Sequence, residues 1–150
     1  MGQGASKPVD FEQLKALMPE ISGWTRGKTS GQQMNMPVSF SQAEASYEKG
    51  DSSLKIEITD SALSQLLLMP LSMFMASGFE QKSDEGYTRA SPIGGSPGFE
   101  EWTNDGKQGE VTAVVGGRFI VKATGRGVDG IEAVRKAVEA VNLSKLASLK

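Results

Sequence analysis

Three glycines near the C-terminus have the spacing of a phosphate-binding turn. Gly125, Gly127 and Gly130 form a G-x-G-x-x-G pattern in "TGRGVDGIEAVRKAV", after a strand-like run and before a helix-like one. A dinucleotide fold also needs a second parallel strand beyond that helix, with an acidic residue about 20 residues after the motif to hold the ribose. Only "NLSKLASLK" follows the helical stretch 131–141. We therefore expect no nucleotide cofactor here.

A structural role explains the same glycine-rich segment. Asp129 is a good N-cap residue and Glu132 follows three positions later, which predicts a capping box at the start of a final helix. Gly125 and Gly127 would give the chain freedom where it leaves a strand. The helix would pack through one apolar stripe, formed by Ile131, Val134, Val138 and Val141.

The absence of cysteine and histidine limits the available chemistry. The chain has Cys 0 and His 0, so it has no thiolate nucleophile, no imidazole base and no zinc site of the usual kinds. Carboxylates remain, but adjacent acids on a strand point to opposite faces, so Glu100 and Glu101 are not a catalytic pair. The other acidic pairs, Glu57 with Asp60 and Asp84 with Glu85, suit solvated strands and turns. We expect no catalytic and no metal-ligating residues, and a protein that is not an enzyme.

A polar stretch after the first helix contains the residues that we single out as a candidate binding surface. In "ISGWTRGKTSGQQMNMP", 21–37, an isolated Trp24 stands beside Arg26, and Met34 and Met36 form an M-x-M pair. A tryptophan beside an arginine could line a groove for a ligand or partner. Thioethers are soft donors that suit Cu(I), so a methionine-based metal site or a small-ligand site is the alternative.

The pattern of elements predicts the α+β class. We expect a short helix from Phe11 capped by Asp10, three strands within 21–59, an apolar helix over 62–78, a meander of four strands, and the final helix. In the third strand, Leu54, Ile56 and Ile58 should face the core. The order α-βββ-α-ββββ-α gives a largely antiparallel sheet of six to seven strands, covered by helices in an α/β/α sandwich.

The N-terminus predicts a tether. Residues 1–9 are rich in Gly, Ser, Lys and Pro, which suggests a flexible segment before a single domain at 10–150. "MGQGASK" also fits the myristoylation pattern through Gly2 and Ser6. We favour a trimmed exported chain over a plain disordered start, and place true myristoylation last.

This layout resembles the PsbP-like α/β/α fold and small bacterial exported proteins or lipoproteins of that type. The segments that carry the resemblance are "GGSPGFEEW" and "AVVGGRFIVKATGRG" with the closing helix. Members of that group are accessory proteins attached to larger assemblies or membranes, so the resemblance implies a binding or assembly role.

Together these patterns favour a non-enzymatic accessory or partner-binding domain. Its partner would be a protein or a small ligand. Its location would be periplasmic or otherwise extracytoplasmic, where a lipid anchor could hold it, with a cytoplasmic location as the alternative. With 16 basic and 18 acidic residues and no long block of one sign, we expect no nucleic-acid partner. The oligomeric state stays open.

Overall fold

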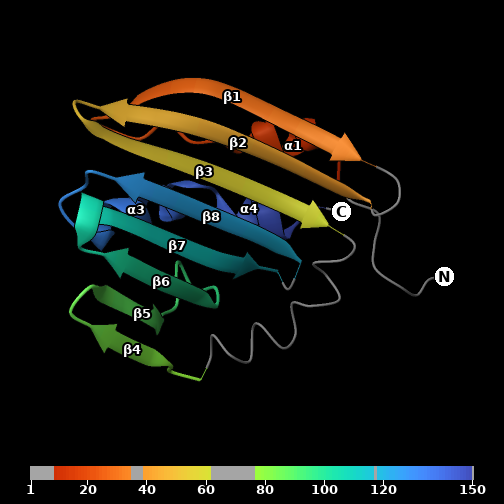
Figure 1. The fold of residues 1–150 in the computed structure, drawn as a ribbon. Coiled ribbons are helices and arrows are strands. Elements are labelled where there is room, and N and C mark those ends of the chain that lie inside the picture. The colour runs from red at the N-terminus through yellow and green to blue at the C-terminus, as the bar shows by residue number, and fades with distance from the viewer. Residues whose placement is uncertain (1–8, 35–38, 62–76, 117, 150) are drawn as a thin grey trace.

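One open antiparallel sheet organises the molecule. The computed structural model describes residues 9–34, 39–61, 77–116 and 118–149. Within these ranges eight strands pair in the order β1-β2-β3-β8-β7-β6-β5-β4 (Figure 1). The strands are β1 (Thr25–Met34), β2 (Phe40–Lys49), β3 (Ser52–Ser61), β4 (Glu80–Ser83), β5 (Gly86–Ala90), β6 (Gly98–Thr103), β7 (Gln108–Val115) and β8 (Phe119–Arg126).

Seven of these strands follow the predicted pattern. The β2–β3 hairpin turns at Gly50 and Asp51, and Leu54, Ile56 and Ile58 are buried, as their alternation predicts. The connections of the meander contain Gly94, Gly95, Gly106 and Gly116, which all have positive φ, a backbone conformation that side chains disfavour. Local chemistry therefore accounts for most of the strands.

The predicted strand count of six to seven is wrong, because the sheet has eight strands. The additional strand is β4, whose sequence "EQKS" is polar and exposed throughout. It has no apolar alternation to reveal it and exists by pairing with β5 at the edge of the sheet. The helix predicted over 62–78 falls largely on 62–76, which lie outside the described residues.

Short helices cover one face of the sheet (Figure 1). They are α1 (Phe11–Lys15), α3 (Ile131–Ala140) and α4 (Leu143–Ala147). Asp10 caps α1 as predicted, since its side chain accepts a hydrogen bond from the Glu12 amide. The mostly antiparallel sheet with helices on one face gives the α+β class.

The cap of α3 differs from the prediction, although the helix begins at Ile131 as expected. Its N-cap is Gly130, with no side-chain hydrogen bond, rather than Asp129 in a capping box. Val128 is buried at 3% exposure while Asp129 is exposed to solvent, so core packing of Val128 accompanies the loss of the predicted cap. The predicted stripe is correct: Val134, Val138 and Val141 are buried and the half-buried Ile131 packs against the core.

The first glycine of the G-x-G-x-x-G pattern has a packing role. Gly125 lies within β8, between β3 and β7, and faces α3. A Cβ added there would come within 2.8 Å of Val134 Cγ2. The glycine therefore lets the final helix approach the sheet closely.

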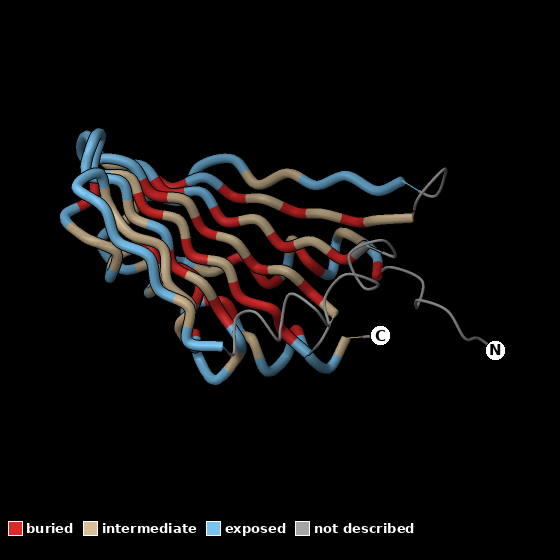
Figure 2. Tube along the Cα trace, turned by 60° about the horizontal axis from the view of Figure 1, so that its bottom comes forward, coloured by how far each residue is buried: buried red, intermediate tan, exposed pale blue. Residues whose placement is uncertain are grey.

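The opposite face of the sheet is polar. Figure 2 shows buried residues alternating along the central strands with partly buried or exposed ones. The outward row Glu44, Glu57 and Lys122 runs across β2, β3 and β8 in register. Among the described elements, every helix that contacts the sheet lies on the other face, which matches an antiparallel sheet with one wet side.

Burial and two backbone hydrogen bonds hold Val9 in place at the start of the domain. Val9, the last residue of the predicted tether, is 4% exposed. Its amide donates to Asp60 Oδ2 at 2.8 Å, and its carbonyl accepts from Ser41 Oγ at 2.5 Å. No described helix is long and apolar enough to span a membrane.

Candidate functional site

Two acidic residues are buried in the fold, and both are neutralised there. Glu100 on β6 is 0% exposed and pairs with Arg89 Nε at 2.8 Å and Arg135 Nη1 at 2.5 Å. The hydrogen bond and charge of Glu100 raise the pKa of Arg89. Glu101 points to the opposite, exposed face, as predicted for neighbours on a strand. Glu100 therefore joins β5, β6 and α3 rather than facing a substrate.

Asp60 makes the second buried pair. Its carboxylate binds Arg118 with two hydrogen bonds, from Nε at 3.1 Å and from Nη2 at 2.8 Å. Asp60 is 0% exposed and also holds Val9, as described above. A carboxylate engaged in this way has a structural role, while Glu57, three residues earlier, lies on the polar face.

The candidate binding site is a groove at the start of β1. It is about 490 Å³ in volume and is lined by Glu20, Ile21, Ser22, Trp24 and Arg26. Trp24 and Ile21 are half-buried and pack against the main core, while Arg26 is exposed. The indole of Trp24 is thus held against the core beside the exposed side chain of Arg26. We call this site the Trp24 groove.

Hydrogen bonds hold the segment behind the groove in place. Tyr47 is fully buried and its hydroxyl donates to the Pro19 carbonyl at 2.6 Å. Arg26 Nη1 donates to the Met18 carbonyl at 3.2 Å. Burial raises the pKa of Tyr47 to about 12, although the Arg26 charge acts in the opposite direction. The loop that carries Trp24 is therefore tied to the core at two points.

A second cation lies near the indole, in addition to Arg26 and the acidic Glu20 of the groove lining. Lys49 Nζ, from the end of β2, lies 6.0 Å from the centre of a Trp24 ring. A cation over an indole is a favourable contact. Sequence reasoning missed Lys49, which is 25 residues from Trp24 and reaches it only because β1 and β2 pair.

The structure brings together two of the four predicted site residues. Trp24 and Arg26 line the same groove. Met34 lies at the opposite end of β1, about 30 Å from Trp24 for a strand of this length. Met36 lies outside the described residues. A methionine site would therefore be separate from the Trp24 groove.

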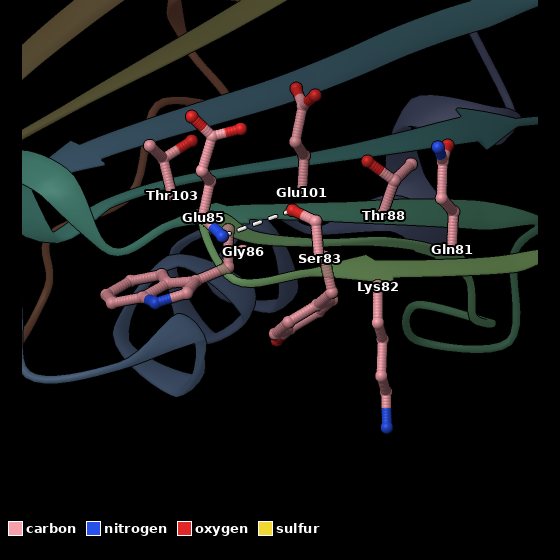
Figure 3. Close-up of a pocket in the computed structure, with 10 residues that line it drawn as sticks. Gln81, Lys82, Ser83, Glu85, Gly86, Thr88, Glu101 and Thr103 are labelled. Atoms are coloured by element: carbon pink, nitrogen blue, oxygen red, sulfur yellow. Dashed lines mark hydrogen bonds between the residues drawn. The ribbon is translucent and has the colours of Figure 1, made fainter.

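A second hollow of about 350 Å³ lies over β4, β5 and β6. Figure 3 shows Thr103, Glu85, Glu101, Thr88 and Gln81 rising on one side, with Lys82 projecting from the other. Ser83 Oγ accepts a hydrogen bond from the Glu85 amide at 3.2 Å. Gly86 contributes no side chain, which leaves space between Ser83 and Thr103. Hydroxyls and carboxylates dominate the side of this hollow opposite Lys82.

A third hollow, of about 520 Å³, lies on the polar face and includes Lys55, Glu57 and Lys122. Its lysines already have acidic neighbours: Lys55 pairs with Glu44 at 3.4 Å and Lys122 with Glu110 at 3.5 Å. Such pairs are typical of a solvated strand face. Of the hollows in the described part of the chain, the Trp24 groove has the composition closest to a binding hot spot, because tryptophan and arginine are enriched in hot spots.

The groove offers little for catalysis. Its titratable groups, Glu20, Arg26 and the nearby Lys49, do not form a nucleophile with a base. Among the described residues no group of three His, Cys, Asp or Glu side chains could hold a metal ion. Comparisons of the chain with protein-family models, with curated proteins and with solved structures found no match.

Proposed function

We propose that this protein is a non-enzymatic accessory domain that binds a partner through the Trp24 groove. The observation that carries the proposal is the pairing of a half-buried indole with an exposed guanidinium beside the free edge of the sheet. Tryptophan contributes large rigid contact area and arginine contributes directional hydrogen bonds, so both act as anchors in protein interfaces.

A peptide or loop in extended conformation is the partner that fits this position. Among the described strands β1 pairs with β2 alone, so its other side presents backbone donors and acceptors beyond the groove. An added strand can satisfy those groups while one of its side chains enters the groove. Because Arg26 and Lys49 stand beside the indole, we expect an acidic or aromatic anchor residue in the partner.

We also propose that the domain works outside the cytoplasm, attached through the segment before Val9. The resemblance to exported proteins and the Gly, Ser, Lys and Pro content of that segment support this proposal. A pulling force on this segment would be transmitted to the sheet at Val9, because the backbone amide and carbonyl of Val9 are hydrogen-bonded to Asp60 and Ser41. Fractionation of cells that produce the full-length protein tests the location.

A small ligand is the second candidate for the same groove. Its volume of about 490 Å³ lies within the usual range for small-molecule sites, roughly 300–1,000 Å³. A ligand with a flat ring and a carboxylate would suit Trp24 and Arg26. Soft metal binding at Met34 would be a separate event at the other end of β1.

The test uses defined binders rather than an unknown partner. A display library of random peptides is selected on the wild-type protein, and each enriched peptide is titrated against Trp24→Ala and Trp102→Ala. We expect acidic or aromatic peptides whose affinity falls about tenfold to a hundredfold in Trp24→Ala, since a hot-spot truncation costs about 2 kcal/mol or more. Trp102→Ala, the matched control at the other tryptophan, should leave the affinity within about twofold. Enriched peptides whose affinity is unchanged in Trp24→Ala, or a selection that enriches no peptide, would contradict the proposal.

A further inference from the structure

The two edges of the sheet differ in length and charge. β4 is four residues long and carries Glu80 and Lys82, which pair with each other at 3.4 Å. β1 is ten residues long and eight of its residues are exposed. Short, charged edge strands resist pairing with another chain, whereas long ones invite it. β1 is therefore the edge at which association would occur.

β1 itself has two different halves. The first half carries Arg26 and Lys28, and its pairing with β2 is interrupted by an irregularity between Arg26 and Thr29. From Thr29 to Met34 the register is regular and the sequence "TSGQQM" has no charge. This second half also contains the exposed large hydrophobic residue found among the described residues, Met34, at 44% exposure.

A two-fold axis at Gly31 would join two copies without conflict. Antiparallel strands in one sheet place opposed side chains on the same face. With Gly31 opposite Gly31 of a second copy, Ser30 lies opposite Gln32, and Lys28 lies opposite Met34. No two like charges face each other in this register, and each Met34 gains the lysine stem as an apolar neighbour.

Phe11 adds an apolar contact at the same point. An added Cβ at Gly31 would overlap the Phe11 ring, so the ring lies directly over this glycine on the helix-covered face. Phe11 is half-buried in the single chain. Opposed Cα atoms across an antiparallel pair are about 4.5–5.5 Å apart, which brings the two Phe11 rings within the distance of an aromatic pair.

We propose that a second copy of this chain pairs antiparallel with residues 28–34 of β1, about a two-fold axis at Gly31, to form one continuous sheet. The paired segment is short, so the interface is smaller than that of stable dimers and we expect a dissociation constant of roughly 10–100 μM. The Trp24 groove lies beyond the paired segment, so a second copy leaves it open and competes with a bound peptide only for the backbone edge of β1. Trp24→Ala should weaken peptide binding without changing dimerisation, so the two proposals can fail separately.

Sedimentation equilibrium of the wild-type chain and two double-lysine variants tests the proposal. In Ser30→Lys with Gln32→Lys, each new lysine faces a lysine of the second copy, and the dissociation constant should rise about tenfold. Gln81→Lys with Ser83→Lys adds the same charge at exposed positions of β4, the opposite edge of the sheet, and should leave the dissociation constant within about twofold. Circular dichroism confirms that both variants remain folded.

Spin labelling gives the register. The chain has no native cysteine, so Gln32→Cys carries a single nitroxide, and the labels of a dimer should show strong dipolar broadening that dilution removes. A label at Thr103→Cys, on β6, should show none. A chain that stays monomeric at millimolar concentration, or a dimer that the Ser30 and Gln32 lysines do not weaken, would overturn the proposal.

Discussion

The buried Glu100 should be worth much more to stability than its neighbour Glu101. Glu100 is 0% exposed and accepts hydrogen bonds from Arg89 and Arg135, while Glu101 is exposed on the opposite face. Glu100→Gln keeps the shape of the side chain but leaves Arg135, whose side chain is 21% exposed, without its counter-charge. Removing one partner of a buried pair costs about 3–5 kcal/mol.

The stability loss expected for Glu100→Gln lies at the lower end of this range. The Arg89 side chain is 43% exposed, so water can solvate it when the carboxylate is lost. We expect Glu100→Gln to lower the free energy of unfolding by about 3 kcal/mol, and the melting temperature by roughly 6–12 °C for a domain of this size. Glu101→Gln, the same substitution one residue away, should change stability by less than about 0.5 kcal/mol.

Urea denaturation followed by circular dichroism measures both variants. A double-mutant cycle with Arg135→Met isolates the pair: the double variant should be more stable than the sum of the single losses predicts, because neither charge is then left alone. Burial and then the Glu100 charge raise the pKa of Tyr87, so Glu100→Gln should also lower that pKa in a spectrophotometric titration. Equal stabilities of Glu100→Gln and Glu101→Gln would refute the reasoning.

Three further predictions follow from the anchored loop, the entry of the chain and the glycine pattern. Since the pKa of Tyr47 is about 12 when folded and 10.0 in the unfolded chain, its contribution to stability is complete below pH 10. We expect roughly 3 kcal/mol to be lost between pH 10 and 12 in alkaline denaturation, and a much smaller loss in Tyr47→Phe. Asp60→Asn should cost about 3 kcal/mol in urea denaturation because Arg118 loses its counter-charge, and a neutral result would contradict the role of that pair. Gly125→Ala should cost about 1–3 kcal/mol by overpacking against α3. Gly130→Ala, whose added Cβ meets nothing within 4 Å, should cost less, at most about 0.5–1 kcal/mol from the poorer N-cap; equal effects in the melting temperature would contradict the packing role.

Local sequence patterns were sufficient for much of the fold. The alternation of Leu54, Ile56 and Ile58 predicted the inward face of β3. β4 could not be predicted in this way, because its four polar residues have no period and form a strand only where β5 offers an edge. The cap of α3 failed for a related reason, since the burial of Val128 in the assembled core outweighed the capping preference of Asp129.

The candidate site was only partly predictable. Trp24 and Arg26 are close in sequence, so their shared groove could be anticipated, but Lys49 depends on the pairing of β1 with β2. Glu100 occupies an inward position between Gly98 and Trp102 on β6, and an acid at such a position was the available signal for a buried pair. Its arginine partner on α3 is 35 residues away, and no local pattern connects them.

Partner binding at the Trp24 groove is the central claim, and amide chemical shifts test it most directly. A ¹⁵N-labelled chain is titrated with a peptide selected on the wild-type protein, and the shifts of Ile21 to Arg26 and of Lys49 are followed. We predict that the largest saturable changes cluster on these residues and vanish in Trp24→Ala. Changes centred instead on the hollow around Gly86, or a spectrum that stays unchanged at saturating peptide, would contradict the claim.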